Sequence, residues 1–322
     1  HAVVGGVLGA GVAAAGIAAV NWPVMAKIAA SWVISPVLGG IIAAGFLAFA
    51  KYFILYKEDK ITAAKKWVPV LVAILASTFS IYLVMKGLKR IWKPDITIIL
   101  IIGACVFAVA YGIVSPIVAK ASKSLENRRK SVSDLFTIPL ICAAALLSFA
   151  HGANDVANAV GPLAAIVSAV SAGTVAAKVT LPIWVLIVGA IGISVGLALY
   201  GPKVIEIVGE KITKLNRVRA FCIALSAAIT VIIASGLGLP VSSTHIAVGA
   251  VFGVGFLREI ITNREKKASR ALPAGAQVSG LSAESFDREK NRLKKAQKRK
   301  LVRRNHLWTI IVAWVITVPA AA

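Results

Sequence analysis

The sequence predicts an all-α, polytopic membrane protein built from inverted-topology repeats with broken or re-entrant helices. Of the 322 residues, 58% are apolar and the mean hydropathy is +0.85, whereas soluble domains are nearer ~45–50% apolar. A soluble core cannot hide this excess in a chain of this length, so a lipid bilayer is the expected solvent. We therefore expect an integral, multi-pass protein of the cell or inner membrane.

Long apolar runs mark the expected helices. Four of them reach the ~20 residues that a spanning helix needs, at 28–50, 67–85, 95–118 and 180–201. Four shorter runs form two pairs joined by Gly-, Pro- and Asn-rich sequence, 135–149 with 159–171 and 220–235 with 245–257. Such pairs predict helices that break or turn back inside the membrane, where protein or a polar cavity must cover the irregular backbone. A last apolar run covers 307–322.

The net charge of +23 is concentrated in short blocks between the apolar runs. The blocks are 51–66, 86–94, 119–134, 202–219 and 258–306. This arrangement is typical of cytoplasmic loops and argues against nucleic-acid binding. The last block holds fifteen Lys or Arg and five Asp or Glu, and a basic helix is expected within it over 287–304.

An internal repeat organises the chain. The segment from His1 to Gly11 aligns with His245 to Gly255 at six identical positions of eleven, and similar Trp-Val-Ile segments follow at Trp32 and Trp314. We divide the chain accordingly into a remnant of a first repeat, central linking helices with basic loops and a second repeat. The respective bounds are 1–50, 51–134 and 135–322.

The charges indicate how the two copies are oriented. The first copy's connector, between Gly11 and Trp32, carries only Lys27, whereas its counterpart in the second copy contains the large basic block. Positive loops stay in the cytoplasm, so the connectors should lie on opposite sides of an inverted repeat. The same reasoning places 119–134 and 202–219 inside with the large block. The basic block 86–94 then falls outside, against the rule.

Asp155 is the centre of the first polar motif. It is the only acidic residue between Asp134 and Glu206, and Asn154 and Asn158 flank it. A carboxylate at membrane depth needs a cation or strong hydrogen bonds, and oxygen donors at a broken helix suit Na⁺. Gly152 would permit the break. A helix-capping role alone is the structural alternative.

The second motif is the segment Gly236 to His245. Its glycines and Pro240 should end one helix, and Ser242, Ser243 and Thr244 should open the next. Backbone N–H groups at a helix start, together with hydroxyl donors, form an oxyanion site, although capping alone would also explain them.

The histidines of the two motifs leave their roles open. A hydrolase built from Ser243, His245 and Asp155 is disfavoured because no nucleophile elbow is present, and no enzyme activity is expected. His151 and His245 could be hydrogen-bonding residues or proton carriers.

At this point the sequence resembles the inorganic phosphate transporter (PiT) family of sodium–phosphate symporters. The resemblance rests on His151-Gly-Ala-Asn-Asp-Val-Ala-Asn-Ala-Val-Gly-Pro162, on Gly238-Leu-Pro-Val-Ser-Ser-Thr-His245 and on the segment that begins at His1. It implies one central site to which both repeats contribute, with alternating access around it. By this resemblance Asn154, Asp155 and Asn158 would hold the cation, and Ser242, Ser243 and Thr244 would hold phosphate.

The resemblance also sets the expected function and its alternatives. It implies import of inorganic phosphate with Na⁺ or, as second choice, H⁺, and no organic cofactor. The corresponding motifs of the first repeat would precede His1, so a chain that starts there should not transport by itself. A sulfate permease and a phosphate sensor without flux stay open, as does association into homo-oligomers.

Overall fold

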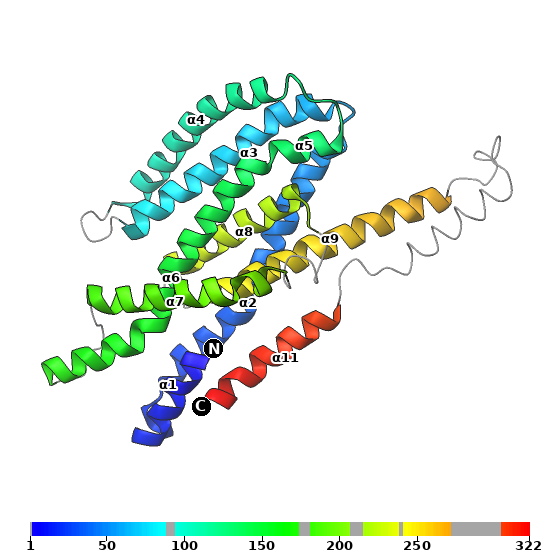
Figure 1. Ribbon diagram of the computed structural model, residues 1–322. Helices are drawn as coiled ribbons and strands as arrows, with labels where there is room; N and C mark the ends of the chain where they lie inside the picture. The colour runs from blue at the N-terminus through cyan, green and yellow to red at the C-terminus, as the bar shows by residue number, and fades with distance from the viewer. Residues whose placement is uncertain (1, 88–93, 174–180, 207–214, 238–240, 272–303) are drawn as a thin grey trace.

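The computed structural model describes residues 2–87, 94–173, 181–206, 215–237, 241–271 and 304–322 (Figure 1). Within these ranges every regular element is a helix, and seven helices are long and apolar enough to cross a membrane. The predicted all-α, polytopic class is confirmed. The elements are α1 (Ala2–Ala15), η1 (Ile17–Ala19), α2 (Trp22–Ala50), η2 (Lys51–Leu55), α3 (Lys60–Tyr82), η3 (Leu83–Gly87), α4 (Ile96–Ala121), α5 (Arg129–Leu135), α6 (Thr137–Ala172), α7 (Ile183–Glu206), α8 (Arg217–Gly236), α9 (Ser243–Ala271) and α11 (Arg304–Ala321).

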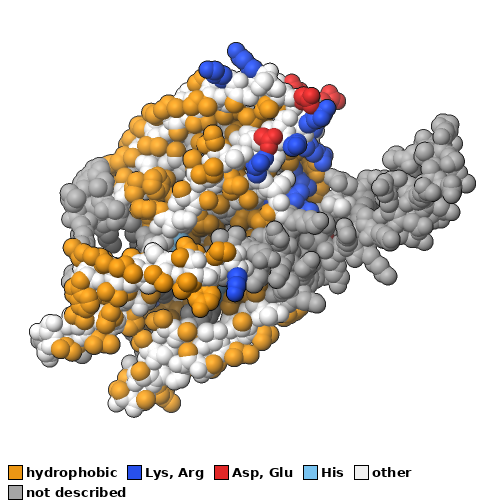
Figure 2. Space-filling view, viewed as in Figure 1, with side chains coloured by type: hydrophobic (Ala, Val, Ile, Leu, Met, Phe, Trp, Pro, Cys, Tyr) orange, Lys and Arg blue, Asp and Glu red, His pale blue; other side chains and the backbone are white. Residues whose placement is uncertain are grey.

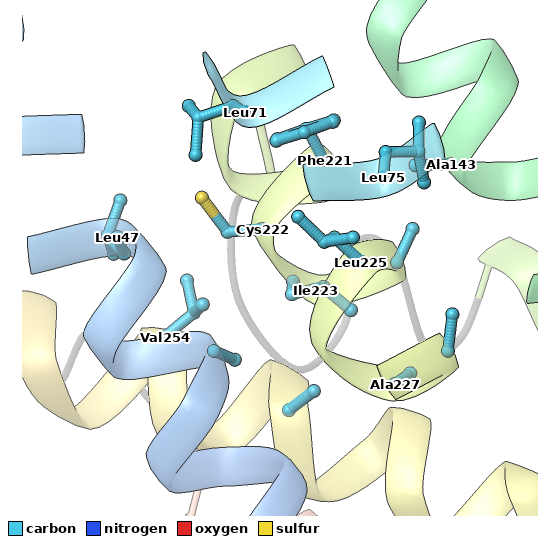
Figure 3. Packing of buried hydrophobic residues seen from close by; sticks show 14 of the residues in the cluster. Leu47, Leu71, Leu75, Ala143, Phe221, Cys222, Ile223, Leu225, Ala227 and Val254 are labelled. Carbon is cyan, nitrogen blue, oxygen red and sulfur yellow. The ribbon is translucent and has the colours of Figure 1, made fainter. Parts of the chain in front are cut away.

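Helix α8 forms the centre of the bundle. Its spanning segment is 72% buried, against 11% for α4 and 6% for α7, so the latter two present most of their apolar surface outward. Phe221 of α8 lies beside α3, and Cys222 of α8 faces Leu47 of α2 within the same buried cluster (Figure 3). The buried hydroxyls of Ser226 and Thr230 bond to carbonyls of their own helix, so α8 can be surrounded by apolar side chains without losing hydrogen bonds.

Helices α2 and α9 cross at backbone contact. A Cβ added to Gly249 would overlap the carbonyl of Pro36, and one added to Gly253 would overlap the carbonyl of Gly40. The four-residue spacing of small residues on both helices permits this approach, as in many membrane helix pairs. The crossing fixes the start of α9 against the middle of α2.

A second crossing joins α1 to α11 in the same way. A Cβ at Gly5 would overlap the carbonyl of Val318, and one at Gly9 would overlap that of Ala322. In the repeat alignment, Gly5 and Gly9 are the counterparts of the two α9 glycines. The repeat also aligns Trp32 with Trp314. Val318 and Ala322, four and eight residues after Trp314, therefore correspond to Pro36 and Gly40 of α2. Each crossing therefore pairs a helix of one sequence repeat with a helix of the other.

Most of the charged side chains on the face that Figure 2 shows gather at one end of the bundle, as a group of blue and red atoms. The side chain of Asn127 accepts a hydrogen bond from Lys60 N and donates one to the carbonyl of Glu58, which joins two connecting loops. Asp134 and Arg217 form an ion pair there. The described parts of 119–134 and 202–219 thus meet at one end, as the charge pattern predicted.

Other sequence predictions about charged segments fall outside the described residues. These include the basic helix expected over 287–304 and most of the block 258–306. The central part of the block 86–94 is also undescribed. Helix η3 ends before it at Gly87, and α4 begins after it at Ile96.

Helix α6 corrects one sequence prediction. A break was expected between 149 and 159, but α6 is continuous from Thr137 to Ala172, and Gly152 is helical within it. The polar side chains here bond to groups on the α8–α9 connection and on α9, so they do not need a broken backbone to satisfy them. The second expected interruption is present, because α8 ends at Gly236 and α9 begins at Ser243.

Candidate functional site

His151 and Asp155 form the polar face of α6 near its middle. They are four residues apart, so they lie one above the other on the helix, and Nε2 of His151 is 3.2 Å from Oδ2 of Asp155. Their side chains are 39% and 26% exposed. The carboxylate is therefore partly exposed, whereas the sequence suggested that an acid within an apolar segment would be buried.

Ser243 brings the second motif to the first. Its Oγ donates a hydrogen bond of 2.9 Å to Oδ2 of Asp155 and lies 2.6 Å from Nδ1 of His151. Ser243 is the first residue of α9 and is buried. The structure thus places the hydroxyl predicted to bind an anion in direct contact with the carboxylate predicted to bind a cation.

Asn154 completes the connection between the motifs. Its Nδ2 donates to Oδ1 of Asp155 and to the backbone carbonyl of Val241, both at 3.0 Å. Both amide protons can thereby be used, and one carboxylate oxygen is held toward the N-terminal side of α9. Val241 was not expected from the sequence, since a backbone carbonyl gives no residue-type signal.

The side chains of His151, Asp155 and Ser243 form a triangle in which each contacts the other two. Three contacts join the three side chains, but a serine hydroxyl and a neutral imidazole supply only two protons. An additional proton on the imidazole or carboxyl would satisfy all three contacts. The hydroxyl and carboxylate oxygens gathered here are of the kind that hard cations prefer.

The neighbouring residues of the second motif have different environments. Ser242 Oγ accepts a hydrogen bond from the backbone N–H of His245 at 3.4 Å, which is a capping contact. Thr244 is exposed. His245 is buried and stacks on Trp314 of α11, with ring centroids 3.7 Å apart. Of the three hydroxyls, only that of Ser243 thus belongs to the triangle. The ring of His245 instead connects α9 to α11.

Asn158 is not part of the triangle. It is exposed and lines a cavity of about 450 Å³ together with Asn21 and residues of α1 and α2. The structure therefore separates the three residues predicted to hold the cation into the contacting pair of Asn154 and Asp155 and a second position one helical turn along α6. The sequence did not indicate that Asn21 lines this cavity, because a lone Asn in a loop predicts a helix cap. Its side chain does cap α2.

The fold and this site define a multi-pass integral membrane protein with a polar centre between its helices. Comparison with known proteins agrees: the sequence model of the phosphate transporter family matches residues 1–322. The chain belongs to the phosphate transporter family.

Individual proteins with phosphate-transport names are also similar to this chain. A Helicobacter pylori protein named "Putative phosphate permease" is 46% identical over all of this chain and 68% of its own length. A Pyrococcus abyssi protein of the same name is 38% identical over 81% of this chain and 64% of its own length. A solved structure titled "The sodium-dependent phosphate transporter" is 32% identical, with a TM-score of 0.77 over 98% of this chain and 68% of that one.

Proposed function

We propose that this protein imports inorganic phosphate together with a cation by alternating access. The observation that carries the proposal is the contact of Asp155 with Ser243, which joins the cation-type and anion-type motifs into one site. Membership of the phosphate transporter family supports phosphate as the substrate. Similarity to a sodium-dependent phosphate transporter supports Na⁺ as the first choice of cation.

The coupling follows from charge. Phosphate brought to Ser242, Ser243 and Thr244 at the start of α9 would be repelled by the carboxylate of Asp155. A cation bound at the carboxylate of Asp155 offsets this repulsion. Cation binding then raises phosphate affinity, and by reciprocity phosphate raises cation affinity. The N–H groups of the α9 start and the positive end of its dipole favour the anion.

The two glycine crossings support an inverted-repeat arrangement around this site. Under the division into 1–50, 51–134 and 135–322, α1 of the first repeat packs on α11 of the second, and α9 of the second packs on α2 of the first. Rocking of one repeat unit against another around a fixed site is a common basis of alternating access. The basic end of the bundle is the expected cytoplasmic side.

Uptake by proteoliposomes tests the proposal. The full-length protein should accumulate labelled phosphate when an inward sodium gradient is applied, and an equal potassium gradient should have little effect. Uptake driven by a pH gradient without sodium would instead select H⁺, for which the contacts of His151 provide a route. Stronger competition by sulfate than by unlabelled phosphate would indicate a sulfate permease, and binding without counterflow would indicate a sensor.

Replacement Ser243→Ala should raise the half-saturating phosphate concentration about tenfold, as expected for loss of one hydrogen bond to a charged group. The hydroxyl also contacts Asp155, so sodium dependence should weaken as well. Initial rates measured against phosphate and against sodium separate the two effects. Thr244→Val removes the neighbouring exposed hydroxyl of the same segment. Ser194→Ala is the matched control, because its exposed hydroxyl donates to the carbonyl of Ala190 within α7.

The comparison also tests the role of each hydroxyl. If Ser243→Ala changes only the sodium dependence, Ser243 belongs to the cation shell, and the predicted phosphate role is wrong for this residue. If neither dependence changes, the proposed site as a whole is contradicted.

A further inference from the structure

The rings of His245 and Trp314 make a stacked contact between α9 and α11. Their centroids are 3.7 Å apart, and the ring planes differ by 25°. His245 is the third residue of α9 and is buried, and Trp314 lies within α11. Stacked aromatic rings contribute stability beyond the apolar area that they bury. The contact therefore holds the first turn of α9 to a helix that is distant in the sequence.

The same turn of α9 carries the hydroxyls of the second motif. Ser243 donates a hydrogen bond to Asp155, and the backbone N–H of His245 donates to Oγ of Ser242 at 3.4 Å. The direction of this turn decides where its N–H groups and hydroxyls point. Because the ring of His245 lies on Trp314 while its N–H contacts the motif, a shift of the Trp314 ring would also turn the motif.

The surroundings of Trp314 leave room beside its ring. Trp314 lines an apolar cavity of about 670 Å³ together with Trp32 of α2 and with Phe252 and Phe256 of α9. The cavity separates α11 from the part of α9 that follows the stack. Dense packing would fix a side chain from every direction, whereas a cavity does not. The stack on His245 is thus a contact that the surrounding packing does not enforce.

Helix α11 is also joined to the first sequence repeat. Gly5 of α1 meets the carbonyl of Val318 at backbone contact. Val318 follows Trp314 by four residues, so both side chains lie on the same face of α11. The placement of α1 and α11 is therefore passed to the start of α9 through the stacked rings. Transporters built from inverted repeats move one group of helices against another, and this contact would make the α9 start respond to such a movement.

We propose that Trp314 is a positioning residue for the anion-binding start of α9. It acts through His245, because the stack keeps the N–H and hydroxyl groups of this turn directed toward the anion. The inference rests on the proposed function, in which the start of α9 binds phosphate. Loss of the stack leaves these groups in place on the chain but no longer directs them, so phosphate binds more weakly.

The test measures sodium-driven phosphate uptake by the full-length protein in proteoliposomes, as initial rates per folded transporter. Trp314→Leu removes the flat ring, and Trp314→Phe keeps a smaller one. Trp308→Leu is the matched control, because Trp308 is exposed on the same helix and does not line the cavity. Melting temperatures of all variants in detergent separate loss of the fold from loss of positioning.

We expect Trp314→Leu to raise the half-saturating phosphate concentration about two- to tenfold, as loss of one aromatic contact predicts. Its maximal rate per folded transporter should stay close to wild type. Trp314→Phe should restore most of the affinity, and Trp308→Leu should behave as wild type. A lower melting temperature with an unchanged half-saturating phosphate concentration would show that the stack is only structural, and would overturn the proposal.

Failure of the proposed function gives a different result. A wild-type protein that takes up no phosphate contradicts the proposed function and this inference together. Wild-type uptake with the same phosphate dependence in Trp314→Leu contradicts this inference alone. Should Trp314→Leu not fold, Trp314→Met removes the flat ring but keeps more of its volume, and it carries the same comparison.

Discussion

Replacement of Asp155 by Asn should reduce sodium-driven phosphate uptake to the level of protein-free liposomes. Asn has nearly the same shape and can keep polar contacts with Asn154 and Ser243, but it removes the charged ligand that a hard cation requires. It also removes the repulsion between the carboxylate and phosphate. Phosphate binding by the variant should therefore lose its dependence on sodium, which isothermal titration with and without sodium would measure.

Asp134→Asn is the control for this change. Asp134 is also an aspartate in an ion contact, but it pairs with Arg217 at the charged end and both side chains are nearly half exposed. Exposed ion pairs contribute only about 0–1 kcal/mol to stability, so uptake by this variant should stay close to wild type. Sodium-driven uptake that persists in Asp155→Asn would show that Asp155 is not the cation ligand.

Replacement of Gly249 by Ala should destabilise the fold strongly for such a small change. The added methyl group would overlap the backbone carbonyl of Pro36, which cannot move away as a flexible side chain can. Overpacking of this kind costs about 1–3 kcal/mol, and the larger Gly249→Leu should prevent assembly of α2 with α9. Thermal unfolding in detergent, followed by size-exclusion chromatography, measures both effects.

Gly45→Ala makes the same chemical change on α2 at a position where an added Cβ would meet nothing within 4 Å. It should leave the melting temperature unchanged or raise it slightly, because glycine inside a helix costs about 0.5–1 kcal/mol relative to alanine. If both alanine variants melt alike, the close crossing of α2 and α9 does not exist in the protein as described.

The sequence predicted the helical class and both motifs because these depend on local composition. Apolar runs define spans without reference to any partner, and a lone Asp155 among apolar residues identifies a polar centre. The meeting of Asp155 with Ser243 was expected only from the family resemblance, which implied one central site.

Continuity of α6 did not follow from local composition. Gly152, Asn154 and Asp155 together resemble a helix break when their partners are unknown, and those partners are 87 and 88 residues away at Val241 and Ser243. The position of Asn158 was equally hidden, because it depends on how α1 and α2 pack beside α6. Contacts distant in sequence decided both outcomes.

The crossing of α1 with α11 has a consequence for how the chain is made. Gly5 and Val318 are roughly 300 residues apart, and ribosomes add about 5–20 residues per second. The partner of α1 is therefore synthesised about 15–60 s after α1 itself. During that time α1 must remain in the membrane or with a chaperone, its glycine face covered by something other than α11. The earliest described helix can therefore reach its final place only after the last described helix has been made.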